Sequence, residues 1–269
     1  MTSLPIRGAA GLVAAFALVL PAAASMPTAQ AAPVQSSQSQ RAALPKYQVT
    51  LKVNTTQAVR KETEIKLRGK VKKGRKGQIV RLQVKYPYTK WKTKKGYTRL
   101  NKDGKFVFKD IADSRNDREY RVLKPGDSRR AAGVSPEVHV DVYYWQGIYD
   151  FGAHENAELD WFKINGEEGS GVRVTTAGQP GFGEMPLARK CLELSGTFGL
   201  ADSVSQAGST GSVTASTDGT QVYTRAFGLG ETEVKTFNVK DVFTFRLDFA
   251  QVSGTPAGAA MNNILGLCD

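Results

Sequence analysis

The stretch "IVRLQVKY", residues 79–86, places an apolar or aromatic side chain at every second position. Val80, Leu82, Val84 and Tyr86 alternate there with cationic and amide side chains. Successive side chains of an extended strand point to opposite faces of a sheet. The period of two therefore predicts a β-strand with one buried face and one solvated face.

The same alternation recurs on both sides of this stretch. The further strands predicted in the first half cover residues 47–53, 65–71, 106–108, 120–122 and 138–142. Asp103-Gly104 is a typical hairpin turn between two of the predicted strands. About seven short strands in roughly 100 residues, without a sustained helical period, are typical of a small antiparallel sandwich. We expect this β-sandwich domain to span residues 46–143.

The second half shows a similar pattern in a sequence richer in glycine and serine. Its predicted strands cover residues 159–164, 172–175, 191–199, 211–216, 221–227, 233–239 and 242–249. Asp218-Gly219 marks another hairpin. The sequence thus predicts an all-β chain of two β-sandwich domains, the second over residues 144–269, joined at 144–147 by a junction too short for a flexible linker.

The N-terminal segment has the pattern of an export signal. Arg7 precedes an apolar run over residues 8–20, and Ala29-Gln30-Ala31 offers a signal-peptidase site. We therefore predict a signal peptide over 1–31, a flexible leader over 32–45 and a secreted protein. No later segment has 18 consecutive apolar residues, so no transmembrane span is predicted.

The chain has two cysteines, Cys191 and Cys268. Export into an oxidising compartment and the absence of a C-x-x-C spacing favour one disulfide over a metal site. Such a bridge would stabilise the fold by about 4 kcal/mol in the chain-entropy model. Two buried free thiols are the alternative.

The formal net charge of +12 hides a division between the two halves. Residues 41–133 contain 28 Lys or Arg against 8 Asp or Glu, and residues 134–269 contain 8 against 17. Such asymmetry indicates two domains and predicts that the basic half attracts polyanions. An attraction between the two halves themselves is the alternative.

Aromatic and basic residues interleave in "VKYPYTKWKTKKGYTRL", residues 84–100. The period of two favours Trp91 as a packing residue, inward or at a corner, with the neighbouring lysines solvated. A stacking strip for sugars or bases is the alternative. The cationic side chains predicted to form one continuous patch for an anionic polymer or lipid headgroups are Lys70, Lys72, Lys73, Arg75, Lys76, Lys90, Lys92 and Lys94.

Motifs of catalysis and cofactor binding are absent from the sequence. His139 and His154 are the two histidines, and the first is expected on a strand surface. There is no G-x-S-x-G elbow, no zinc-ligand spacing and no phosphate-binding glycine loop that leads into a helix. We therefore predict no catalytic residue, no metal and no cofactor. A glycosidase would need only two carboxylates, such as Glu155 and Asp160, and calcium binding stays open.

The first half resembles the Ig-like or fibronectin-III-like modules common in secreted actinobacterial proteins. The resemblance rests on a "G-K-V" strand, "VRLQV", Trp91, the "DGKFVF" hairpin and the "YRV" strand in this order. It covers about 100 residues and carries no binding site. On this resemblance Trp91 is a packing residue.

The second half is similar to the NPCBM-type modules, a jelly-roll group proposed to bind carbohydrate. The stretches that carry the similarity are "WFKINGEEGSGVRV", "LELSGTFGLADS", "VTASTDG" and "FRLDF". The segment before Leu200 is shorter than in that family, and a late aromatic is missing from "NNILGLCD". The resemblance implies glycan binding, for which we expect Trp145, Trp161 and Asp160, although both tryptophans also fit a packing role.

Together these observations predict a secreted, non-catalytic protein that binds carbohydrate or cell wall. In this hypothesis the second domain binds the glycan and the basic domain contacts an anionic polymer. The alternative is a structural or protein-interaction module of the cell surface. Specific nucleic-acid binding is not expected, because an exported protein does not meet such a partner.

Overall fold

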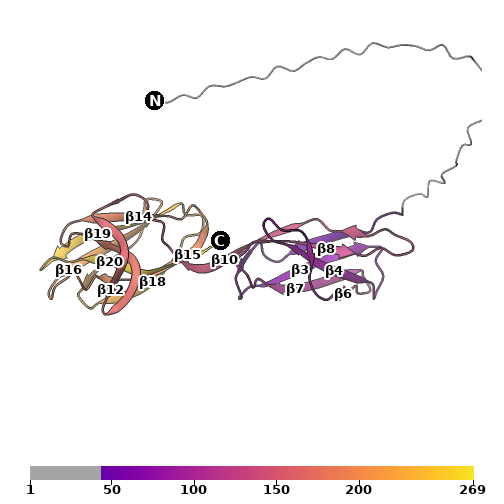
Figure 1. Cartoon of the computed structure of the whole chain (residues 1–269), viewed down its shortest axis with the longest axis horizontal. Coiled ribbons are helices and arrows are strands. Elements are labelled where there is room, and N and C mark those ends of the chain that lie inside the picture. Colours follow the sequence, from indigo (N-terminus) through magenta and orange to yellow (C-terminus); the bar gives the residue numbers. More distant parts are fainter. Residues whose placement is uncertain (1–43) are drawn as a thin grey trace, which may run out of the picture. The chain divides into compact units, whose positions relative to one another are not determined.

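The computed structural model describes residues 44–269, and the predicted signal peptide and most of the leader lie outside this range. Every regular element in the described range is a β-strand, which confirms the all-β class (Figure 1). Within residues 44–269, no helix has the length and apolar character needed to cross a membrane.

The first β-sandwich packs a three-stranded sheet against a second, larger one. The three-stranded sheet has the order β1 (Gln48–Val53), β3 (Glu64–Lys72), β7 (Lys105–Ile111), and all of its pairs are antiparallel. The opposing layer contains β10 (Val138–Gly147), β8 (Arg118–Lys124) and β4 (Ile79–Lys85) in this order. Short strands extend it: β2 (Gln57–Val59), β5 (Lys92–Thr93), β6 (Thr98–Arg99) and β9 (Gly133–Val134).

The core of this sandwich follows the alternation seen in the sequence. Val80, Leu82 and Val84 of β4 are at most 4% exposed, and they pack with Ile65 and Leu67 of the opposing sheet. Apolar side chains from the two inner faces thus remove each other from water, which stabilises the fold.

The second β-sandwich also consists of two layers. One layer contains β12 (Ala157–Ile164), β13 (Glu167–Val174), β20 (Ala259–Cys268), β15 (Cys191–Leu200) and β18 (Thr232–Asn238). The other has the order β11 (His154–Glu155), β14 (Gly181–Pro186), β19 (Thr244–Ser253), β16 (Thr210–Thr217), β17 (Thr220–Gly228). Buried aromatic rings, including Phe198, Phe237 and Phe245, fill the space between the layers.

Strand β20 lies at the centre of its layer, although the sequence pattern did not predict it. It pairs with β13 and β10 along one edge and with β15 along the other. The predicted disulfide is present: Cys268 at the end of β20 bonds Cys191 at the start of β15, 77 positions earlier.

Strand β10 takes part in both sandwiches. Its first part pairs with β8, as in Val138 with Tyr120, and its last part pairs with β20, as in Trp145 with Leu267. The junction at 144–147 is therefore a continuous strand. The described residues, 44–269, group as one compact unit, and the division into domains at residue 144 stays a prediction.

Candidate functional site

The outer face of the β10–β20–β15 layer carries exposed aromatic side chains. Trp145 and Gly147 of β10 lie two positions apart, so both face the same side of the sheet. Gly147 pairs with Leu265 of β20. The ring of Tyr149 lies over Gly147, because a Cβ at this glycine would be 2.4 Å from the ring atoms. Trp145 is 41% and Tyr149 is 67% exposed.

Polar side chains border these rings on the neighbouring strands. Ser195 of β15 pairs with Leu265 and also with Thr236 of β18. The Thr236 hydroxyl donates a hydrogen bond to Ser195 Oγ at 3.1 Å. We call this surface, made of Trp145, Tyr149, Leu265, Ser195 and Thr236, the aromatic face. It combines apolar rings with hydroxyl groups on the outside of a sheet.

The other two predicted glycan-binding residues lie elsewhere. Trp161 and Asp160 are on β12, which pairs only with β13 and not with β10 or β20. They are consecutive in a strand and so point to opposite faces. Asp160 is held in an ion pair with Arg173 at 3.4 Å. The structure therefore does not join Trp145, Trp161 and Asp160 into one site.

Cationic side chains surround a hollow of 530 Å³ at one end of the first sandwich. Its four cations are Lys73, Arg75, Arg129 and Arg130, and Ser128 adds a hydroxyl group. Within residues 44–269, none of the four forms an ion pair with a carboxylate closer than 4 Å. We call this hollow the basic basin.

Asp127 is the acidic side chain of the basic basin, and its oxygens are already engaged. Oδ2 accepts hydrogen bonds from Tyr47 Oη at 2.5 Å and from Gln78 Nε2 at 3.0 Å. Oδ1 accepts from the backbone N–H groups of Arg129 and Arg130. The Tyr47 hydrogen bond, followed by the one from the Arg129 backbone, lowers the pKa of Asp127 to about 2. The carboxylate thus fixes the turn that presents both arginines.

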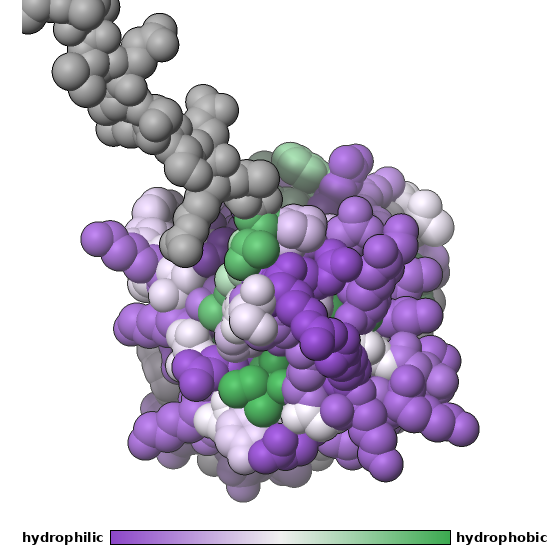
Figure 2. All heavy atoms as spheres, turned by 90° about the vertical axis from the view of Figure 1, so that its right-hand side faces the viewer, coloured by the Kyte–Doolittle hydropathy of each residue, from purple (hydrophilic) through white to green (hydrophobic). Residues whose placement is uncertain are grey.

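The end of the molecule that belongs to the first sandwich is mostly hydrophilic at its surface, with small hydrophobic areas between (Figure 2). A second hollow next to the basic basin is lined by Lys46 and Lys72 together with Lys73 and Arg130. The concentration of positive charge therefore extends from the basic basin onto the neighbouring surface.

The predicted continuous cationic patch is divided between the two sheets. Lys70 and Lys72 are on β3 of the three-stranded sheet, whereas Lys92 is on β5, which pairs with β4 of the other layer. Lys94 is ion-paired with Asp110, so its charge is locally compensated. Lys73 and Arg75 line the basic basin, and Lys76 and Lys90 are exposed.

Trp91 is half-buried, but its ring lies outside the core of the sandwich. The guanidinium of Arg121 lies 4.1 Å and the ammonium of Lys85 lies 5.7 Å from the ring centroid. Both cations are on the outer face of their strands, so the ring packs against this face rather than inward. Cation–π contacts of this kind stabilise a partly exposed tryptophan.

A third hollow, of 640 Å³, lies on the five-stranded sheet, but its charges satisfy one another. Arg246 is ion-paired with Glu184 at 3.2 Å and Asp248 at 2.7 Å, and its guanidinium covers the Phe182 ring at 3.7 Å. Asp218 accepts hydrogen bonds from backbone N–H groups, chiefly that of Thr244, which lowers its pKa. We therefore give this hollow a structural role.

Several residues of these sites were not predicted from the sequence. Tyr149 has no periodic partner, and its position depends on the bare backbone of Gly147. Arg129 and Arg130 follow the "PGDS" turn, and two adjacent arginines after a turn are the signal that would have indicated them.

Comparisons with known proteins find distant structural likenesses. No protein-family model matches the chain, and no curated protein matches it. A solved structure of the M60 catalytic domain of Clostridium perfringens ZmpB with two CBM51 domains aligns with 82% of this chain at 9% identity and a TM-score of 0.39; the chain spans 31% of its length. CBM51 from Clostridium perfringens GH95, in complex with methyl-galactose, aligns with 45% of this chain and 99% of its own at 10% identity, with a TM-score of 0.38. At these TM-scores, neither likeness assigns a ligand to this chain.

Proposed function

We propose that this chain is a non-catalytic carbohydrate-binding protein that holds glycan on the aromatic face. The observation that carries the proposal is the pair of exposed rings, Trp145 and Tyr149, on one side of a sheet. The outer face of an antiparallel sheet is normally polar and solvated. Exposed apolar side chains that gather there mark a surface for a binding partner.

The chemistry of a sugar fits this surface. A pyranose ring has a face of C–H groups that packs on an aromatic ring and a rim of hydroxyl groups that form hydrogen bonds. Trp145 and Tyr149 supply the rings, and Ser195 and Thr236 supply hydroxyl donors and acceptors nearby. Tryptophan and tyrosine contribute strongly at binding surfaces because they bury a large area and lose little conformational freedom.

The test compares single tryptophan variants of the whole chain in pull-downs on insoluble polysaccharides and purified cell wall. Half-molar salt is used, because it screens contributions from exposed charges. Trp145→Ala is expected to weaken binding by at least about tenfold, as for a truncated anchor residue at a binding surface. Trp161→Ala is the matched control, because Trp161 is 64% exposed on another strand, and it should bind within about twofold of the wild type on the same principle.

The outcomes separate the hypotheses cleanly. Equal binding by Trp145→Ala and the wild type would remove the aromatic face from the proposal. An equal loss in Trp161→Ala would return the site to β12. If the wild type binds no glycan, the chain is better described as a structural or protein-interaction module.

We further propose that the basic basin contacts an anionic polymer, such as the charged component of a wall. The specific observation is the set of four cations around one hollow without ion pairs among the described residues. Arginine presents a planar fork of donors that matches phosphate and carboxylate groups. The basic basin and the aromatic face would then bind the same cell wall, the basin through charge and the face through stacking of its rings on sugars.

Charge reversal in the basic basin tests this contact. Arg129→Glu with Arg130→Glu is compared with Lys163→Glu and Lys240→Glu, which changes the net charge equally at exposed positions in the second half. The basin variant should elute from heparin and polyphosphate columns at clearly lower salt than the control variant. Equal elution would mean that overall charge, rather than the basin, determines retention.

A further inference from the structure

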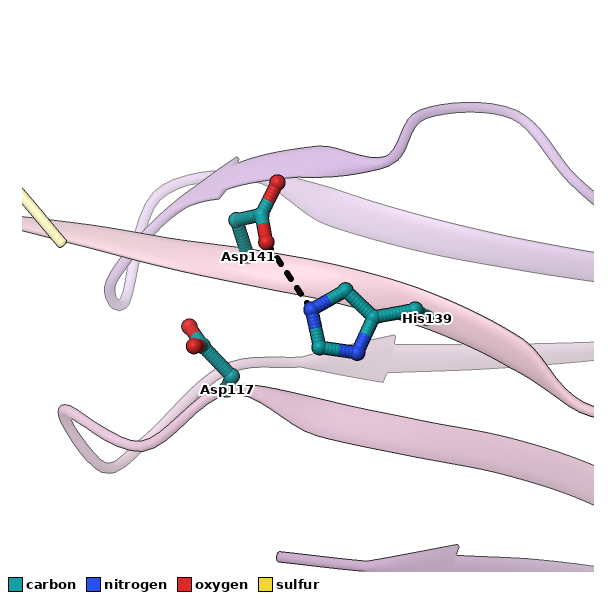
Figure 3. Close-up of side chains that lie close together, drawn as sticks. All are labelled: Asp117, His139 and Asp141. Atoms are coloured by element: carbon teal, nitrogen blue, oxygen red, sulfur yellow. Dashed lines mark hydrogen bonds and ion pairs between the residues drawn. The ribbon is translucent and has the colours of Figure 1, made fainter. Parts of the chain in front are cut away.

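The side chains of Asp117, His139 and Asp141 meet beside β10 (Figure 3). His139 and Asp141 are two positions apart on β10, so they face the same side of the sheet. Asp117 immediately precedes β8, the strand that pairs with the first part of β10. One ligand atom of each residue lies within 4.8 Å of those of the other two. The three groups thus converge from two neighbouring strands.

Hydrogen bonds hold the groups in place. Asp117 Oδ1 accepts the backbone N–H of Val142 at 2.8 Å, which fixes this carboxylate against β10. His139 Nε2 lies 2.9 Å from Asp141 Oδ1, so imidazole and carboxylate already share one small region. A hollow of about 230 Å³, lined in part by Asp117 and His139, opens beside them and leaves room for an ion with its water.

Two cations, Lys85 and Arg118, also line this hollow, but each is paired with other carboxylates: Lys85 with Glu119, and Arg118 with Asp110 and Asp113. Among the described residues, neither Asp117 nor Asp141 forms an ion pair with lysine or arginine. Asp269, which follows β20, adds a third carboxylate. Its pKa is raised first by burial and then by the nearby charges of Asp117 and Asp141, while Lys190 partly offsets this.

We propose that Asp117, His139 and Asp141 bind one divalent transition-metal ion of the zinc class. Imidazole nitrogen is a preferred ligand of zinc, copper and nickel, whereas sites for calcium and magnesium use oxygen alone. Zinc binds histidine and carboxylate at about 2.0–2.2 Å, so its ligands lie about 3.4 Å apart in a tetrahedral site. His139 Nε2 and Asp141 Oδ1, at 2.9 Å, would separate slightly as the ion replaces their hydrogen bond, and the ligand atom of Asp117, within 4.8 Å of both, would move closer.

The sequence did not indicate this site because its spacing is not that of a zinc motif. His139 and Asp141 are separated by one residue in a strand, and Asp117 is more than twenty positions earlier. Only the pairing of β8 with β10 brings them together. The site is independent of glycan binding, since none of its residues belongs to the aromatic face or the basic basin.

The experiment is calorimetric titration of zinc chloride into the tag-free chain, with calcium chloride titrated separately. The wild type should bind about one equivalent of zinc, and His139→Ala and Asp117→Asn should each bind at least about tenfold more weakly, by analogy with the loss of a supporting group at metal sites. The matched control is His154→Ala, which removes the other histidine of the chain, exposed on β11. It should leave the affinity unchanged.

Nuclear magnetic resonance of the histidine rings gives a second measurement that does not depend on a variant folding. Zinc should shift the ring signals of His139 and leave those of His154 in place. The proposal is overturned if the wild type binds no zinc or if His139→Ala binds as tightly as His154→Ala. Tighter binding of calcium than of zinc would also overturn it, because the ligand class would then be oxygen alone.

Discussion

The two β-sandwiches fill their interiors with different chemistry. In the first, Arg118 and Lys124 are buried to 1% and 3% exposure, and each lies near a tyrosine ring, Tyr86 at 5.3 Å and Tyr47 at 4.3 Å. In the second, the buried interior consists of phenylalanine, methionine and aliphatic side chains with one disulfide, and its buried polar side chains, such as Asn262, are uncharged.

Because of this difference, different kinds of substitution are expected to destabilise the two sandwiches. A buried charge is stable only while its partners are present, so the first interior depends on directional pairs. An apolar interior depends on the volume that it fills and on the contacts between its rings. The high content of lysine and arginine in the first half therefore extends from its surface into its core.

The largest loss of stability is expected from a substitution that removes a buried charge partner from the first sandwich. Asp110 accepts a hydrogen bond from Tyr120 Oη at 2.7 Å, is ion-paired with Lys94 and lies 3.7 Å from Arg118 Nη1. Asp110→Ala leaves the buried guanidinium of Arg118 without its buried carboxylate partner, since the remaining partner, Asp113 at 3.4 Å, is 80% exposed. The variant should lower the free energy of unfolding by about 3–5 kcal/mol. Chemical denaturation measures this loss.

The matched control is Asp103→Ala, which removes an exposed carboxylate from a turn of the same sandwich. Its effect should stay within about 0.5 kcal/mol. A loss below about 1 kcal/mol for Asp110→Ala, typical of an ordinary substitution, would show that the first interior does not depend on the pairing of Arg118.

A smaller effect is expected from the disulfide of the second sandwich. Replacing Cys191 and Cys268 by alanine should lower stability by about 2–4 kcal/mol, because the unfolded chain regains the freedom that the cross-link removes. The number of thermal unfolding transitions, measured by differential scanning calorimetry, then shows whether the two halves unfold together. If the cysteine variant and Asp110→Ala shift two different transitions, the predicted domain division holds, and a shift of one shared transition contradicts it.

The smallest effect concerns pH and the basic basin. The folded pKa of Asp127 is about 2, below the roughly 3.9 of an unfolded aspartate, so its contribution is present above about pH 4 and is lost as the pH falls toward 2. Asp127→Asn should therefore be less stable than the wild type at pH 6, and the gap should close toward pH 2. Melting temperatures of both proteins across this pH range measure the difference in stability. A difference that does not change with pH contradicts the lowered pKa of Asp127.

Much of the fold followed from the sequence, since alternation indicates a strand wherever one face is buried and the other is solvated. Strand β20 escaped because it lies at the centre of a sheet and its run "AAMNNILGLC" does not alternate. Of the residues predicted from the sequence to bind glycan, Trp145 lies on the proposed aromatic face. Trp161 and Asp160 lie on β12, and the strand order of the sheet, which cannot be read from a local sequence pattern, separates β12 from β10. Their part in glycan binding stays a prediction.

The continuity of β10 has a mechanical consequence. Trp145 lies on the same strand as Val140 of the first core. No flexible linker therefore separates the aromatic face, the proposed glycan-binding site, from the first sandwich. A pull between polymer and chain would pass directly along this backbone as tension. The disulfide ties the end of β20, the strand beside Trp145, to β15. Under a pulling force, β20 would therefore resist separation from its sheet, and the proposed glycan-binding site would deform little before the glycan dissociates.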